Sequence, residues 1–165
     1  MNHMKKFIVL ISLILLISCA EHLPEIDPAN PAYAFYVIFE SLINESVDLN
    51  NINYAALDLT DIESLYIVPF IQLVQNYCDT NGYTLLLMDF EELKENGYLT
   101  SLEHDLDRVY FEKGVLISFF DEELSENTLT TSAHSWNAWS RGAEFTVEKV
   151  NDSWEITSVD RPWVS

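Results

Sequence analysis

Apolar residues recur at helical spacing just after residue 31, and they predict the first helix of the folded part. The stripe spaced i, i+3, i+4 and i+7 consists of Phe35, Ile38, Phe39 and Leu42. This spacing places the apolar side chains on one helix face, where they can bury against a core. Asn30 is a suitable N-cap and Pro31 suits the first helical position, so we expect a helix from there to about Ser46.

A second amphipathic stretch lies between residues 60 and 82. Its apolar stripe consists of Ile67, Phe70, Ile71, Val74, Tyr77 and Cys78. We expect Pro69 to restart the helix, because proline lacks the N–H that an interior turn needs, and Gly82 to end it. Cys78 lies on the stripe, which predicts a small buried side chain and not a catalytic nucleophile.

Two short apolar segments predict strands, and a capping pattern predicts a short helix. The segments are residues 54–59 and 84–88. Asp89 with Glu92 three residues later is the pattern of a capping box, and Met88 is placed to pack on Leu93. We therefore expect a helix of about two turns that ends at Gly97.

The last third of the chain alternates with a period of two, as half-buried antiparallel strands do. The predicted strands are residues 114–120, 128–136, 144–150 and 153–159. Asn151 and Asp152 join the last two in a tight turn, since both residue types tolerate positive φ. The patterns together predict an α+β fold, with N-terminal helices packed on a C-terminal antiparallel sheet of about four strands.

A different pattern occupies residues 1–18. Lys5 and Lys6 precede an almost wholly apolar run that ends in the small residue Ser18, an order typical of an export signal. The run is shorter than the about 20 apolar residues of a membrane-spanning helix. The last residues of this run with Cys19, read as "LISC", resemble the lipobox of bacterial lipoproteins. The resemblance implies that the Cys19 thiol is acylated and that the chain is cut before it.

The lipoprotein resemblance divides the chain into three parts. These are a signal peptide (1–18), a lipidated Cys19 with a proline-rich tether (19–30) and a single α+β domain (31–165). Several acyl chains would hold the protein firmly to a membrane of the cell envelope. By resemblance to lipoprotein sorting patterns, Ala20 after the cysteine favours the outer over the inner membrane where the host has both.

The charge of the chain limits its partners. It has 27 acidic and 8 basic residues, and loss of residues 1–18 would leave 6 basic residues and a formal charge of −21. Such a field repels nucleic acid and anionic lipid surfaces, so membrane contact must come from the lipid anchor. Solubility alone can also account for the acidity. With Cys19 lipidated, Cys78 has no partner for an intramolecular disulfide.

The C-terminal third also resembles the end of small, uncharacterised bacterial lipoproteins. The matching features are the small pair Gly142-Ala143, a strand, the polar turn at Asn151-Asp152, and a strand that contains Trp154. Asp152 stands where that pattern usually has glycine. The resemblance implies a terminal hairpin and points to no catalytic or binding residue.

The chain shows no sequence motif of a catalytic or cofactor site. It has no Gly-x-Ser-x-Gly elbow, phosphate loop or dinucleotide fingerprint. The scattered residues His104, Asp105, Asp107, Asp121 and His134 lack short-range ligand spacing. We therefore predict no catalytic residue, no metal and no cofactor.

Aromatic residues are the candidates for ligand binding. Trp136 and Trp139 have opposite parity, so a regular strand would turn them to opposite faces and leave one exposed. Arg141 can bind a carboxylate or cross-link its own loop. Core filling is the alternative role for both tryptophans.

These observations predict a lipid-anchored, acidic protein of the cell envelope that binds a protein or a small ligand without catalysis. The pocket is expected between helices and sheet. Two alternatives remain: a small envelope hydrolase, and an immunity-type or inhibitor protein whose acidity complements a basic partner.

Overall fold

The computed structural model describes residues 25–46, 52–62, 64–102, 105–137 and 140–164. Three helices are described, namely α2 (Ala32–Ser46), α3 (Ser64–Asn81) and α4 (Phe90–Glu95). The strands within the same residues are β1 (Tyr54–Asp58), β2 (Thr84–Leu87), β3 (Thr100–Leu102), β4 (Asp105–Tyr110), β5 (Gly114–Leu124), β6 (Thr128–Trp136), β7 (Ser140–Val150) and β8 (Ser153–Val164). No helix in these ranges is long and apolar enough to cross a bilayer.

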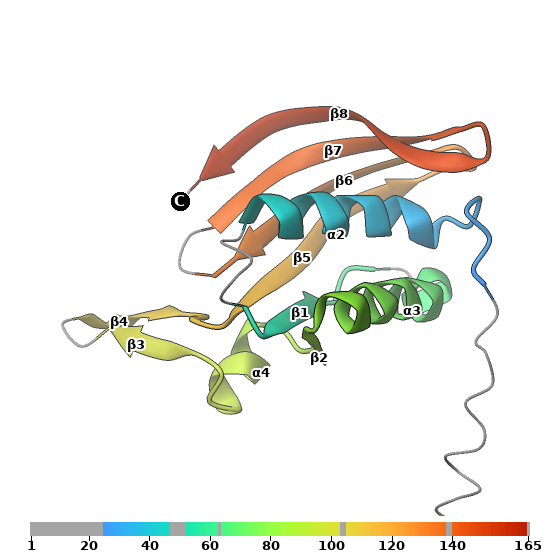
Figure 1. Cartoon of the computed structure of the whole chain (residues 1–165). Coiled ribbons are helices and arrows are strands. Elements are labelled where there is room, and N and C mark those ends of the chain that lie inside the picture. Colours follow the sequence, from blue (N-terminus) through green and yellow to red (C-terminus); the bar gives the residue numbers. More distant parts are fainter. Residues whose placement is uncertain (1–24, 47–51, 63, 103–104, 138–139, 165) are drawn as a thin grey trace, which may run out of the picture.

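The main sheet combines parallel and antiparallel strands. Within the described residues it has six strands in the order β2-β1-β5-β6-β7-β8. β1 runs parallel to both β2 and β5, whereas β5 to β8 form an antiparallel meander. β3 and β4 form a separate antiparallel pair. Figure 1 shows α2 and α3 in front of the main sheet and the β3–β4 pair at one side.

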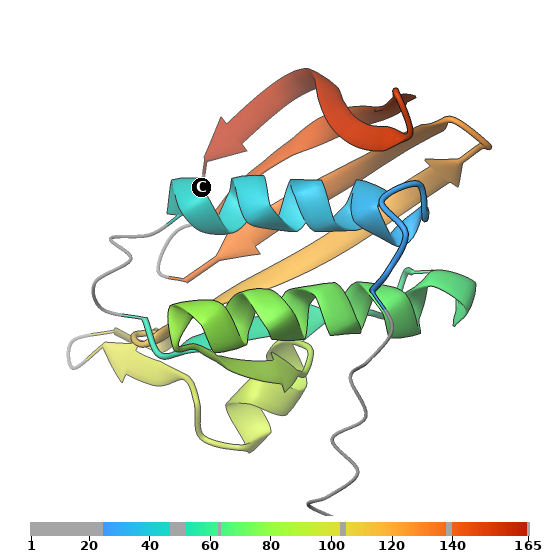
Figure 2. The same ribbon diagram turned by 45° about the vertical axis from the view of Figure 1, so that its right-hand side comes forward.

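The helices α2 and α3 bury one face of the sheet and make the main core. Figure 2 shows them side by side along this face. Phe35 of α2, Phe70 of α3 and Phe119 of β5 meet there, with ring centroids 5.6 to 5.9 Å apart. All three rings are almost completely buried. Buried aromatic rings of this size dominate the packing of a core.

A smaller core lies on the other face of the sheet, under α4. Its buried residues are Ala56, Leu86, Leu93, Phe111 and Leu116. α4 begins with the expected capping box, because Asp89 accepts from the Glu92 N–H at 2.8 Å and donates its own N–H to Glu92 Oε2 at 3.1 Å. Met88 packs against the cluster that contains Leu93, as expected.

Alternation along the strands separates the two faces of the sheet. In β6 every second residue is buried, namely Leu129, Thr131, Ala133 and Ser135. The β7–β8 turn has the predicted positive φ, 50° at Asn151 and 63° at Asp152. This geometry matches the right-handed twist of the two strands.

The predicted α+β class is confirmed, whereas the sheet of about four antiparallel strands is wrong. The four predicted hairpin strands are present as β5 to β8; β6 has the predicted bounds, whereas the other three are longer than expected. Two parallel strands extend the sheet, and α3 connects them, so the helices precede the sheet only in part. Parallel pairing needs a long crossover, which leaves no local signal in the sequence.

Three further expectations concern helix ends. α2 ends at Ser46 as predicted, and Asn30 Oδ1 accepts from the Ala32 N–H at 2.9 Å, as an N-cap does. Pro69 does not restart a helix, because α3 continues through it from Ser64 to Asn81. Burial of α3 against the sheet outweighs the hydrogen bond that proline removes.

The folded part also includes the end of the predicted tether. Ile26 packs against the main core, and the Ala29 carbonyl accepts a hydrogen bond from Trp154 Nε1 at 3.2 Å. Trp154 thereby connects β8 to the segment before α2. The residues from Ile26 to Ala29 therefore contact the folded domain.

Candidate functional site

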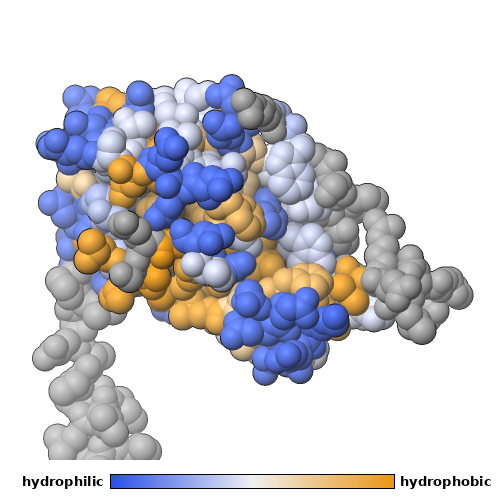
Figure 3. Space-filling model, turned by 180° about the vertical axis from the view of Figure 1, so that it is seen from behind, coloured by the Kyte–Doolittle hydropathy of each residue, from blue (hydrophilic) through white to orange (hydrophobic). Residues whose placement is uncertain are grey.

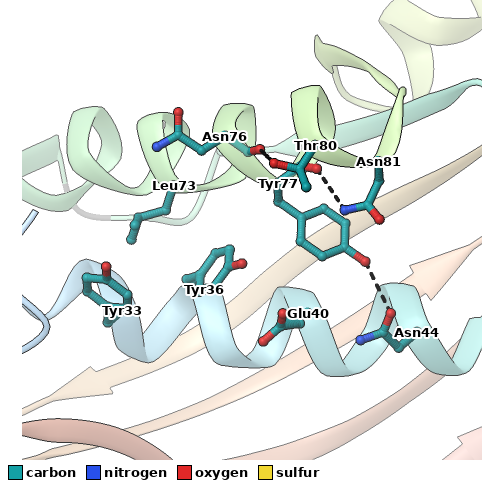
Figure 4. Close-up of a pocket in the computed structure, with 9 residues that line it drawn as sticks. All are labelled: Tyr33, Tyr36, Glu40, Asn44, Leu73, Asn76, Tyr77, Thr80 and Asn81. Carbon is teal, nitrogen blue, oxygen red and sulfur yellow. Dashed lines mark hydrogen bonds between the residues drawn. The ribbon is translucent and has the colours of Figure 1, made fainter. Parts of the chain in front are cut away.

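A solvent-open groove lies between α2 and α3, on the side of the helices that faces away from the core stripe. Its volume is about 600 Å³, within the range of small-molecule sites of about 300–1,000 Å³. It is lined by Tyr33, Tyr36, Glu40, Asn44, Leu73, Asn76, Tyr77, Thr80 and Asn81. Figure 4 shows the α2 side chains directed toward α3, and Tyr77 directed from α3 toward α2.

The sequence of α2 places this groove beside the core. Tyr33, Tyr36, Glu40 and Asn44 follow one another at intervals of three and four residues, which aligns them along one side of the helix. The core stripe of α2, which includes Phe35 and Phe39, is turned to the sheet and is fully buried. The stripe with Phe35 and Phe39 therefore packs against the sheet, and the adjacent stripe with the tyrosines faces the groove.

Tyrosine rings form the walls of the groove. Tyr36 contacts Tyr33 edge to face, with centroids 6.0 Å apart, and Tyr77 at 6.5 Å. Tyr77 also contacts the buried ring of Phe39 edge to face at 5.4 Å. Such contacts add stability beyond area burial and hold the rings in place. The groove consequently has rigid aromatic walls.

The phenol groups of Tyr36 and Tyr77 stay protonated at physiological pH. Burial, the charge of Glu40 and a hydrogen bond to Glu40 raise the pKa of Tyr36 to about 12. Burial, with smaller effects of Tyr83 and Glu40, also raises the pKa of Tyr77. A neutral phenol can both donate and accept a hydrogen bond.

Some polar groups of the groove already have partners. The Tyr77 hydroxyl donates to Asn44 Oδ1 at 3.1 Å, and this bond joins the two helices (Figure 4). The Thr80 hydroxyl and the Asn81 amide donate to carbonyls of their own helix at 2.8 and 2.9 Å. The side chains of Asn44, Asn76 and Asn81 also line the groove.

The expected pocket between helices and sheet does not coincide with this groove. The space between α2 and the sheet is filled by buried residues such as Phe35, Ile38 and Phe119. Close packing of that layer leaves no room for a ligand. The groove lies instead between the two helices.

Cys78 is buried behind the groove, as its place on the apolar stripe predicts. Its side chain is completely inaccessible. Burial, with a smaller effect of Asp79, raises the pKa of the thiol to about 12. The thiolate is the reactive form of cysteine, so Cys78 is not a nucleophile in the folded protein.

The predicted ligand-binding residues do not form one site. Trp136 is half-buried and packs on Phe90 of α4 edge to face, with centroids 5.1 Å apart. Arg141 is exposed, and its Nη1 donates to the Glu45 carbonyl at the end of α2, at 2.9 Å. Trp136 thus fills the smaller core and Arg141 cross-links a strand to a helix. Cys19 and Trp139 lie outside the described residues.

Carboxylates also gather where the parallel strands β1 and β2 end, which is a common ligand site in sheets. Asp58, Asp89 and Glu92 line a hollow of about 260 Å³ there. Asp58 accepts from the Thr60 hydroxyl at 2.6 Å, whereas Asp89 and Glu92 cap α4. In the described ranges no three His, Cys, Asp or Glu side chains are grouped to hold a metal ion.

The sequence interpretation missed the groove tyrosines. The periodicity places Tyr77 on the apolar stripe of its helix and gives Tyr33 and Tyr36 no role. The available signal was the second stripe on the first helix, where tyrosines, Glu40 and Asn44 recur at helical spacing. Comparison of the chain with protein-family models, with curated proteins and with solved structures found no match.

Proposed function

We propose that the protein is a lipid-anchored, acidic binding module of the cell envelope, whose α2–α3 groove takes a neutral, hydroxyl-rich ligand such as an oligosaccharide. The groove of about 600 Å³, walled by tyrosines and edged by amides, is the observation that carries this proposal. Aromatic rings stack on the apolar faces of sugar rings, while phenols and amides match hydroxyl groups.

The composition of the groove favours binding over hydrolysis. Of the residues that line it, Glu40 alone is a carboxylate, and none is His, Cys or Lys. Glycoside hydrolysis by the usual mechanism needs two carboxyl groups that flank the bond. The groove offers hydrogen bonds and aromatic contact without an acid and base pair, which supports a module that holds its ligand unchanged.

The acyl anchor is supported by the sequence around Cys19 and is tested on the native protein. Intact mass and membrane fractionation would be compared between the wild type and Cys19→Ala. We expect the wild type to lack residues 1–18, to gain the mass of acyl chains and to stay with the membrane, and the variant to do none of these. A wild-type protein of unmodified mass outside the membrane fraction would refute the anchor.

The groove is tested with a panel of neutral oligosaccharides by isothermal titration calorimetry. Tyr36→Phe keeps the ring and removes the hydroxyl. We expect the affinity for the oligosaccharide to fall by about three- to tenfold, which corresponds to the loss of one hydrogen bond. Tyr66→Phe is the matched control, because Tyr66 lies on α3 outside the groove lining and packs at the core edge. Equal effects of the two substitutions, or no binding by the panel, would reject the groove as a sugar site.

A further inference from the structure

Glu40 is the one carboxylate among the described residues that line the α2–α3 groove. It lies in the middle of the exposed stripe of α2, after Tyr33 and Tyr36 and before Asn44. Figure 4 shows its side chain between those of Tyr36 and Asn44. The charge of Glu40 acts on the phenol of Tyr36 and also on that of Tyr77 across the groove. A ligand that fills the groove therefore meets this carboxylate.

Two hydroxyl protons beside Glu40 already have acceptors within the protein. The Tyr77 hydroxyl donates to Asn44 Oδ1 at 3.1 Å, and the Tyr36 hydroxyl donates to the Glu40 carboxylate. A hydroxyl group has a single proton to donate, so both phenol oxygens can then only accept from a ligand. The two phenols and the carboxylate together present acceptors at the centre of the groove.

Glu40 retains acceptor capacity after its bond with Tyr36. An ionised carboxylate has two oxygens with about four lone-pair sites, and one phenol occupies one of them. No described residue that lines the groove is Lys, Arg or His. Hydrogen bonds to a charged acceptor are roughly twice as strong as those between neutral groups. Neutral donors that a ligand brings to Glu40 would therefore be bound strongly.

A hollow on the opposite side of the sheet does not have the same combination of groups. Figure 3 shows that side, where hydrophilic and hydrophobic residues are interspersed. Thr130 and Ser132 lie there, because they alternate along β6 with residues buried under the helices. The hollow of about 330 Å³ is lined by Asp121, Glu123, Thr130, Thr131, Ser132 and Glu144. None of these residues has an aromatic ring on which a sugar could stack.

We propose that Glu40 determines the specificity of the α2–α3 groove by accepting hydroxyl protons from the bound sugar. This role rests on the proposed sugar-binding function. The tyrosine rings hold the apolar face of a sugar ring, and its hydroxyl groups turn their protons to the carboxylate. The groove then binds oligosaccharides with free hydroxyls. It excludes sugars whose hydroxyls are capped as ethers and sugars that carry carboxylate or sulfate groups, because these leave Glu40 without a donor or repel it.

The probes are maltotriose, cellotriose and mannotriose, each with its per-O-methylated form. Methylation keeps the rings and the oxygen acceptors and removes every hydroxyl proton. Calorimetric titration of the full chain measures the affinity for both forms. We expect the wild type to bind at least one of the free trisaccharides, and to bind the methylated form of that sugar at least about tenfold more weakly.

Glu40→Gln tests the carboxylate without a change of shape, because the amide replaces one acceptor oxygen by an N–H donor. The variant should bind the free trisaccharide at least about tenfold more weakly than the wild type. Its preference for the free over the methylated form should also be smaller. The matched control is Glu45→Gln, which removes the same charge from an exposed residue of α2 outside the groove lining. We expect less than about a twofold change for this control.

Each other outcome overturns the role of Glu40. Unchanged affinity of Glu40→Gln for the free trisaccharide would leave the sugar site in place without this residue, and equal losses in the two variants would mean that only net charge matters. An unchanged preference for the free form in Glu40→Gln would mean that Glu40 merely supports the tyrosine walls. Equal affinity of the wild type for both forms would show that binding needs no hydroxyl proton. Absence of binding by all three trisaccharides would instead reject the sugar site itself.

Discussion

The two faces of the sheet are built from the same strands but pack against different surroundings. Phe119 and Phe120 are adjacent in β5, yet Phe119 lies between Phe35 and Phe70 under the helices. Phe120 instead stacks on His134 on the side of the sheet away from α2 and α3, which we call the open face. Burial dictates apolar residues on the covered face. Beyond the area under α4, folding does not require the open face to carry aromatic rings among carboxylates. The comparison teaches that the same strand packs one aromatic ring into a closed core and leaves its neighbour only partly buried on the other side.

The largest expected effect compares these two neighbours directly. Phe119→Ala should lower the free energy of unfolding by about 3–5 kcal/mol, because it leaves a cavity among packed rings. Phe120→Ala should cost less than about 2 kcal/mol, because its ring is only partly buried. Urea unfolding measures both. Equal losses would show that the open face is as much a core as the covered one.

Gly142→Ala should have the next largest effect, about 1–3 kcal/mol of stability lost by overpacking. Its Cβ would lie 2.5 Å from the Trp163 ring and 2.8 Å from the His134 Cβ. The double variant Gly142→Ala with Trp163→Ala should regain part of the loss, since one of the two clashes disappears. Strictly additive losses in thermal unfolding would mean that Trp163 does not rest on Gly142.

The capping box of α4 should contribute less to the stability of the fold than Phe119 or Gly142. Asp89→Ala removes the side chain that accepts from the Glu92 N–H, which should cost about 1 kcal/mol. The part of the second face that α4 covers would loosen, and the main core would not. Glu95→Ala is the control, because Glu95 is exposed on the same helix. Hydrogen exchange would contradict the prediction if protection fell equally around Phe119 and Leu93.

Local signals in the sequence account for much of the fold. The period of two identified β5 to β8, because each hairpin strand packs beside its neighbour in sequence. The cap residues Asn30 and Asp89 located two helix starts through bonds that span three residues or fewer. These features depend on residues that are close in sequence, and hydrophobic periodicity detects patterns among such residues.

The features that the sequence did not reveal depend on contacts between distant segments. The parallel pairing of β1 with β5 joins Tyr54 to Gly114, and no pattern in either segment encodes its partner. The groove needs Tyr36 and Tyr77, which meet only because α2 and α3 lie side by side on the sheet. The hypothesis for Trp136 and Trp139 depends on strand parity alone, which does not show what covers each face of the sheet.

The smallest expected effect is the pH dependence that His134 contributes. Burial lowers the pKa of His134 below its ordinary value of 6.5, and the charge of Asp58 opposes this. Between the lowered pKa and 6.5 the unfolded chain binds more protons than the folded one, so acidification destabilises the fold. The contribution of His134 is fully present above pH 6.5 and is lost as the pH falls from 6.5 to the pKa of the folded state.

His134→Gln removes this titration while the carboxylates remain, so the difference in stability between variant and wild type isolates it. Urea unfolding at several pH values should show that the wild type loses more stability than the variant below pH 6.5. A difference that does not vary with pH would mean that His134 is solvated on an open surface. A difference of opposite sign would mean that the attraction of Asp58 for the imidazolium outweighs burial of the ring.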